Sequence, residues 1–195
     1  MRYPAILLAP ALALILLGGC ASPNSRFYTL SSTATATAPP SELAVAVGPV
    51  SVPAAVDRAE IVVTTGPNQV HLDEFNRWAS PLKDEVSRVV TENLVALLGT
   101  PRVTQSAQSL SGDVTYRVTI EVQRFDSAPG DSATLDALWT VRRPKDDKSL
   151  TGRTAAREPI SGLGYEDIAA AHSRALARMS RDIANAVWAL EGSAR

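Results

Sequence analysis

The residue with the most specific chemistry in this sequence of 195 residues is Cys20, its only cysteine. A positive charge at Arg2 is followed by an apolar run over residues 5–17, and two glycines stand directly before the cysteine. This order of charge, apolar run and small residues is typical of a signal peptide and its cleavage site. We therefore expect residues 1–19 to be removed, so that Cys20 becomes the first residue of the mature protein.

The tetrapeptide Leu17-Gly18-Gly19-Cys20 resembles the lipobox of bacterial lipoproteins. In that pattern the thiol of the cysteine receives a diacylglycerol and its freed amine receives a third acyl chain. The resemblance therefore implies a lipoprotein that carries acyl chains such as palmitate on Cys20. Several acyl chains on one residue hold a protein at a membrane more firmly than one myristoyl chain does.

Two other interpretations of the leader are a transmembrane anchor and a plain secretory signal. Residues 5–19 would span about 22 Å as a helix, which is less than the ~30 Å hydrocarbon core of a bilayer, and Pro10 interrupts them. Ala21 follows the cysteine where an aspartate would resemble an inner-membrane sorting signal. We therefore expect attachment to the periplasmic face of the outer membrane, with the inner membrane as the alternative.

The histidines and paired acids of the sequence do not form a recognisable catalytic or metal-binding pattern. His71 and His172 are far apart and outside an H-E-x-x-H pattern, so each is predicted to be a surface or capping residue. The run that begins at Gly162 resembles the start of a dinucleotide-binding loop, but Asp167 stands where the third glycine belongs. Adjacent acids are expected in solvated turns or at helix starts. They are Asp73-Glu74, Asp146-Asp147 and Glu166-Asp167.

We expect no catalytic residue, no metal site and no cofactor, because the sequence also lacks a P-loop and a G-x-S-x-G elbow. A small periplasmic hydrolase stays open as an alternative, since two catalytic carboxylates can be far apart in a sequence. A solute-binding lipoprotein is the other alternative. The first would need a polar cleft with shifted carboxyl pKa values, and the second a closed apolar pocket.

The charge and the length of the chain narrow the class of protein further. The 19 basic and 20 acidic side chains give a net charge of −1, without the basic surface that nucleic acid requires. The chain that remains after removal of residues 1–19 is long enough for one well-packed domain. With Cys20 acylated, no disulfide can form, so packing alone must stabilise the core.

The segment after the cysteine connects the lipid to the domain. Residues 20–26 are predicted to be a tether, and residues 27–195 a single domain. Residues 27–30 are expected to form a short strand that docks onto this domain. Residues 31–41 contain only Ser, Thr, Ala and Pro, a composition with little to bury, and are predicted to be a mobile surface loop.

Alternating and β-branched runs predict the strands of this domain. The run that ends at Gly48-Pro49 is apolar at nearly every position, which indicates a strand buried on both faces. From Val114 every second residue is apolar, which indicates a half-exposed antiparallel strand followed by two return strands. The predicted strands cover residues 43–52, 61–65, 69–72, 114–123, 133–141 and 149–158.

Two amphipathic helices are predicted from apolar residues at steps of three and four. For the first helix, Ser80 is the predicted cap, Gly99 ends the pattern, and Asn93 is the one polar residue on the apolar side. The second helix covers residues 166–190. It is expected in the core rather than on a membrane surface, because it has many alanines and few aromatic residues.

Three stretches of the sequence match a known family in their order and residues. They are Phe27-Tyr28-Thr29-Leu30 soon after the cysteine, Val47-Gly48-Pro49-Val50-Ser51-Val52-Pro53 followed by Asp57-Arg58 and Ile61-Val62, and Phe75-Asn76-Arg77-Trp78-Ala79-Ser80-Pro81-Leu82, which is expected to open the first helix. The chain resembles the ABC-type transport auxiliary lipoprotein family, of the paraquat-inducible protein C type.

This resemblance implies a non-enzymatic lipoprotein component of a lipid transport system built on a mammalian-cell-entry (MCE) protein. Such a component would dock the MCE protein at the membrane and support membrane integrity, with an inner-membrane permease as the third partner and self-association left open. The implied fold is α+β, a mostly antiparallel sheet with two helices on one face, similar to the N-terminal domain of TolB. The two helices and about six strands predicted from the residues fit that arrangement.

The two most specific matches supply the candidate partner-binding residues Asp57, Arg58, Arg77 and Trp78. Arginine and tryptophan are frequent anchors at protein interfaces. The alternative is a structural role for both pairs. Asp57 and Arg58 can close a turn, and Trp78 can pack under the sheet at the start of the first helix.

Overall fold

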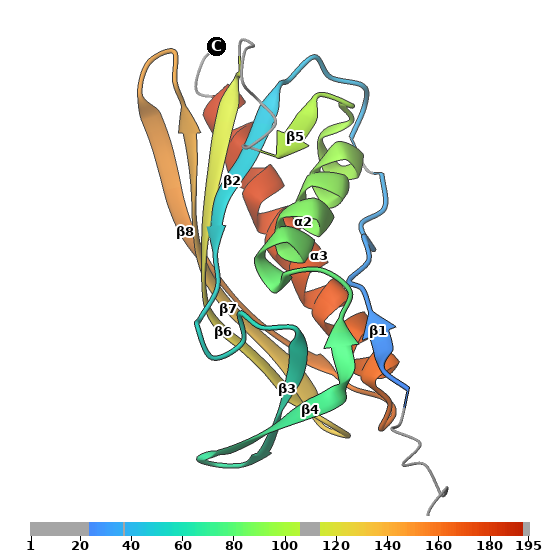
Figure 1. The fold of residues 1–195 in the computed structure, drawn as a ribbon. Coiled ribbons are helices and arrows are strands. Elements are labelled where there is room, and N and C mark those ends of the chain that lie inside the picture. The colour runs from blue at the N-terminus through green and yellow to red at the C-terminus, as the bar shows by residue number, and fades with distance from the viewer. Residues whose placement is uncertain (1–23, 37, 106–113, 193–195) are drawn as a thin grey trace, which may run out of the picture.

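The computed structural model describes residues 24–36, 38–105 and 114–192, which form an α+β domain of two sheets and two helices (Figure 1). The strands are β1 (Arg26–Tyr28), β2 (Val45–Ser51), β3 (Glu60–Gly66), β4 (Gln69–Trp78), β5 (Val103–Gln105), β6 (Tyr116–Ala128), β7 (Ser132–Arg143) and β8 (Lys148–Pro159). The helices are α2 (Leu82–Leu98) and α3 (Tyr165–Gly192). The expected α+β class is confirmed.

The larger sheet has five strands in the order β5-β2-β6-β7-β8. Strands β6, β7 and β8 form the predicted antiparallel meander, and alternate residues of β6 are buried from Tyr116 to Val122. Strand β2 lies inside the sheet, as predicted, but runs parallel to both of its neighbours. Parallel neighbours are joined by long connections rather than tight turns, so no local turn sequence indicates them.

The smaller sheet has three strands in the order β1-β4-β3 and contains the predicted β3–β4 hairpin. Strand β1 pairs in parallel with the end of β4, so the segment after the tether docks onto the domain as expected. The stretch Phe75–Leu82 leads into the first helix, but its first four residues extend β4 beyond the predicted strand 69–72. The domain therefore has two mixed sheets where one mostly antiparallel sheet was expected.

Helices α2 and α3 lie side by side on one face of the larger sheet, as predicted (Figure 1). Their apolar sides are buried, including Leu94 of α2 and Ile183 of α3. Gly99 ends α2 in the left-handed conformation that glycine adopts without strain. The predicted cap at Ser80 was wrong, because Pro81 occupies the N-cap position and no side chain caps the helix.

The described residues of the segment 31–41, here called the strap, lie against the two helices (Figure 1). The side-chain oxygen of Asn93 accepts hydrogen bonds from the backbone N–H groups of Thr33 and Ala34 at 3.2 and 3.1 Å. The Asn93 side chain also donates to Ser180 of α3 at 3.2 Å. Buried polar side chains of the helices therefore bind the backbone of the strap, and the composition of the segment did not indicate these contacts.

Candidate partner-binding site

The four candidate residues meet at one hollow of about 410 Å³ on the small sheet. Asp57 and Arg58 come from the turn after β2, whereas Arg77 and Trp78 end β4. Phe27 of β1 and the segment 79–81 before α2 complete the lining. The structure thus joins two sequence motifs that lie on separate elements.

Backbone hydrogen bonds hold the two motifs together. The N–H groups of Val56 and Asp57 both donate to the carbonyl of Pro53, at 3.0 and 3.1 Å, which folds the turn tightly. The N–H of Trp78 then donates to the carbonyl of Ala59 at 2.7 Å, which ties the end of β4 to this turn. Main-chain hydrogen bonds therefore bring the two motifs together. No ion pair between their charged side chains is needed to hold them there.

Strand β1 forms one wall of the hollow. Phe27 is the register partner of Arg77, and the N–H of Ala79 donates to the carbonyl of Tyr28 at 2.9 Å. The Phe27 side chain is 64% exposed. The sequence interpretation gave Phe27 only a role in the strand, because the pairing of β1 with β4 is needed to place its ring beside Arg77.

The charges around the hollow are only partly neutralised. Arg77 forms an ion pair with Glu60 across the sheet, at 3.2 Å. Asp57 and Arg58 are exposed and form no ion pair within the described ranges. Free guanidinium and carboxylate groups beside an exposed aromatic ring can bind a polar protein segment of complementary charge.

Trp78 supports the hollow from below. Its side chain is only 4% exposed, and its ring packs edge-on against Phe125 of β6 with centroids 6.3 Å apart. Phe125 in turn stacks on His172 of α3 at 3.7 Å. The structural interpretation therefore fits Trp78 better than the contact interpretation, since little of its surface is available to a partner.

His172 was predicted to be a surface or capping residue, and this was wrong. Its side chain is fully buried, with Nε2 at 2.9 Å from the Ser127 hydroxyl. Burial lowers the pKa of His172 to about 3, so the ring is neutral. It is a core residue rather than a catalytic base. His71, by contrast, is exposed on the hairpin as predicted.

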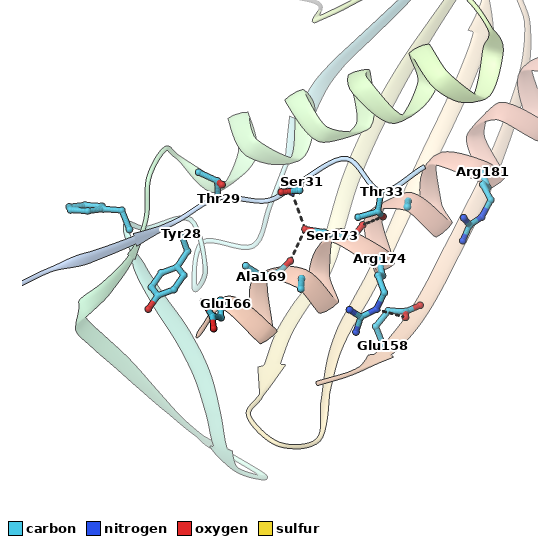
Figure 2. Close-up of a pocket in the computed structure, with 13 residues that line it drawn as sticks. Tyr28, Thr29, Ser31, Thr33, Glu158, Glu166, Ala169, Ser173, Arg174 and Arg181 are labelled. Carbon is cyan, nitrogen blue, oxygen red and sulfur yellow. Dashed lines mark hydrogen bonds and ion pairs between the residues drawn. The ribbon is translucent and has the colours of Figure 1, made fainter. Parts of the chain in front are cut away.

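A second concave region runs along α3 and has a volume of about 770 Å³. Figure 2 shows one side formed by Tyr28, Thr29, Ser31 and Thr33, and the other by Ala169, Ser173, Arg174 and Arg181. The N–H of Ser31 donates to the Ser173 hydroxyl at 3.0 Å, and Arg174 pairs with Glu158 at 3.4 Å (Figure 2). Many lining side chains are exposed, so this region is an open groove rather than a closed apolar pocket.

The carboxyl groups with shifted pKa values do not suggest a catalytic acid. Although burial opposes the change, hydrogen bonds from Tyr165 and Asn76 lower the pKa of Asp73 to about 2. A hydrogen bond from Arg143 lowers the pKa of Asp146 to about 2, and Arg153 lowers that of Asp136. A general acid needs a raised pKa instead. None of these three groups lines the hollow or the groove.

The described part of the chain also contains no cluster of three metal-ligating side chains. Within the same ranges, neither helix combines the length and apolar character that crossing a bilayer would need. The fold and its exposed hollow define an α+β domain with a surface suited to binding.

Comparison with known proteins assigns this domain to a family. The family model for the ABC-type transport auxiliary lipoprotein component matches residues 28–184, and the chain belongs to this family. No curated protein matches the chain in sequence. The family is one of lipoproteins that assist transport, which agrees with the expected class.

Two solved structures share the fold. The crystal structure of an uncharacterised protein is 20% identical with a TM-score of 0.70, over 85% of this chain and 99% of that one. The crystal structure of a DUF330 protein from Xanthomonas campestris is 18% identical with a TM-score of 0.69, over 87% of this chain and all of that one.

Proposed function

We propose that this protein is the non-enzymatic, lipid-anchored component of an MCE-type ABC lipid transport system of the bacterial envelope. In this role it docks the MCE-domain protein at the periplasmic face of the outer membrane, while an inner-membrane permease is the third component. The observation that carries the proposal is the meeting of both family-matching motifs, Asp57-Arg58 and Arg77-Trp78, at one exposed hollow.

The construction of the hollow supports binding rather than catalysis. Its walls carry exposed charges from Asp57 and Arg58 and an exposed ring from Phe27, while its floor is the buried Trp78. Exposed anchors above a buried floor suit protein recognition, since Trp78 is already packed and needs no further ordering when a partner binds. The MCE partner would place an acidic and apolar segment there, opposite Arg58, Arg77 and Phe27.

The short tether supports the proposal that the partner reaches across to this protein. Strand β1 begins at Arg26, only six residues after Cys20, and these residues reach at most about 20 Å at ~3.3 Å each. With Cys20 acylated, the domain stays against its own membrane. An elongated MCE protein rooted in the opposite membrane could reach it there.

The proposal is tested by crosslinking in cells that express the full-length lipoprotein. A photoreactive residue is placed at Ser80, which is exposed and lines the hollow, and in a matched strain at Ser149, which is exposed on β8. We expect a covalent product with the MCE-domain protein from Ser80 and none from Ser149. Equal products from both sites, or none from Ser80, would contradict docking at the hollow.

A further inference from the structure

Three loops and the start of the described chain gather at one end of the domain (Figure 1). The loops are the β3–β4 turn, the β6–β7 turn and the connection from β8 to α3. The connection from β8 to α3 contacts both hairpins: the N–H of Ile160 donates to the carbonyl of Asp131 in the β6–β7 turn at 3.0 Å, and the hydroxyl of Tyr165, the first residue of α3, donates to Asp73 within β4 at 2.7 Å. We call this region the anchor-side end, because the described part of the chain begins here (Figure 1).

The anchor-side end exposes apolar side chains that the fold does not cover. Leu163, before α3, is 82% exposed, and Val70, beside the β3–β4 turn, is 56% exposed. Pro67 and Pro129 are also exposed in their turns. These apolar side chains do not pack in the core, so they do not stabilise the fold by burial. A surface that covers all the loop tips together would remove them from water, which is favourable.

The loops at the anchor-side end hold fewer charged residues than the turn at the opposite end of the domain. Within residues 66–70, 128–132 and 160–164 the only charged residue is Asp131, and it pairs with Arg157 at 2.8 Å. The β7–β8 turn lies at the opposite end (Figure 1), and residues 144–148 there hold two lysines and two aspartates. One end is therefore suited to an apolar layer and the other to water.

We infer that the anchor-side end rests on the phospholipid surface, with Leu163 and Val70 inserted at its apolar boundary. The inference rests on the lipid anchor of the proposed function. The short tether keeps this end close to the acyl chains on Cys20, so the bilayer is the surface that the tips must meet. Helices α2 and α3 then point away from the membrane.

Apolar contact rather than charge holds this end. Arg26, at the start of the described chain, and Glu166, at the start of α3, are exposed and form no ion pair with any described residue, so charges of both signs lie beside this end and neither sign dominates. We therefore expect the contact to form on phosphatidylethanolamine and to change little with ionic strength, unlike the binding of a basic patch to anionic lipid.

The test uses the full-length lipidated protein in vesicles of phosphatidylethanolamine with phosphatidylglycerol as the minor lipid. Because acylation consumes Cys20, a new cysteine is the only free thiol and can carry a fluorophore that reports its surroundings. One variant is Leu163→Cys. The matched control is Leu150→Cys, which is 39% exposed on β8 beside the opposite turn.

Lipids with a nitroxide on the acyl chain should quench the label at residue 163 several times more strongly than the label at residue 150. Equal, weak quenching in protein that still sediments with the vesicles would keep the lipid anchor and overturn the inference. Shielding of residue 163 from water without quenching by lipid would show that a protein surface covers it, which also overturns the inference. If the protein fails to sediment with the vesicles, the lipid anchor is contradicted, and the membrane contact that rests on it is contradicted as well.

Discussion

The two sheets of this domain differ in what their faces meet. The larger sheet turns the apolar side of β6 and β7 toward α2 and α3, where it is buried. The smaller sheet buries Ile61 and Val63 of β3 on one side, but Phe27 and Val70 stay exposed. Stability is therefore concentrated in the larger sheet and its helices, whereas the smaller sheet is free to contact other molecules.

A stack of three rings connects the two regions. Trp78 of the small sheet packs on Phe125 of the large sheet, and Phe125 packs on His172 of α3. This stack holds the hollow at a defined position relative to the helices. A partner bound at the hollow therefore meets a surface whose base is already ordered, which reduces the entropic cost of binding.

The largest effect is expected from truncation in the region of the large sheet and its helices. Leu94→Ala should lower the free energy of unfolding by about 2–5 kcal/mol, because it leaves a cavity in the packed core. Val95→Ala, the next residue and an exposed one, is the matched control and should change it by about 0.5 kcal/mol or less. Chemical denaturation measures both, and similar losses in the two variants would break the contrast between core and surface.

The stability of the core should depend on pH, because His172 belongs to the ring stack and is buried. Burial keeps His172 neutral in the fold, whereas the unfolded chain binds a proton below its ordinary pKa of 6.5. Stability should therefore fall as pH decreases from 6.5 towards 3, by about 1.4 kcal/mol per pH unit from this group. Denaturation of the wild type and of His172→Gln between pH 7 and 4.5 should show a steeper fall in the wild type. Parallel curves would mean that His172 takes up a proton in the fold.

Attachment of the strap should have a smaller effect. Asn93→Ala leaves two backbone N–H groups and one hydroxyl of the strap without their acceptor. We expect a loss of about 1–3 kcal/mol in thermal or chemical unfolding. Asn185→Ala, at an exposed position of α3, is the control and should be close to neutral. An Asn93→Ala protein as stable as this control would show that the strap is held in some other way.

Sequence periodicity predicted the regions whose burial is encoded locally. The alternation along β6 and the apolar side of α3 each specify their own inner face, so both elements were predicted correctly. The predicted strand 69–72 was too short, because the family-matching stretch at Phe75–Trp78 continues β4. The parallel pairing of β2 and the burial of His172 depend on partners far away in the chain, and no local pattern indicates such contacts.

The candidate site also combines features that the sequence indicated with features that depend on contacts between distant residues. The resemblance to the family supplied the residues, but their spacing did not show that Arg58 and Arg77 line one hollow. That placement depends on the hydrogen bond between Trp78 and Ala59 and on the docking of β1. Phe27 was missed as part of the site for the same reason.

The smallest effect on stability is expected at the hollow. Arg58→Ala removes an exposed side chain that forms no ion pair with the described residues, so unfolding should change by about 0.5 kcal/mol or less. Arg117→Ala, at an exposed position of β6 on the large sheet, should be equally neutral. Thermal unfolding of both variants checks this, and a large loss for Arg58→Ala would show that the turn needs its side chain.

The same two variants provide the most direct test of partner binding at the hollow. The affinity of the full-length protein for the purified MCE-domain protein is measured by calorimetry in detergent. Arg58→Ala should weaken binding by about tenfold or more, whereas Arg117→Ala should bind like the wild type. Equal affinities for wild type and Arg58→Ala, or a loss only for Arg117→Ala, would contradict the assignment of the docking surface to the small sheet.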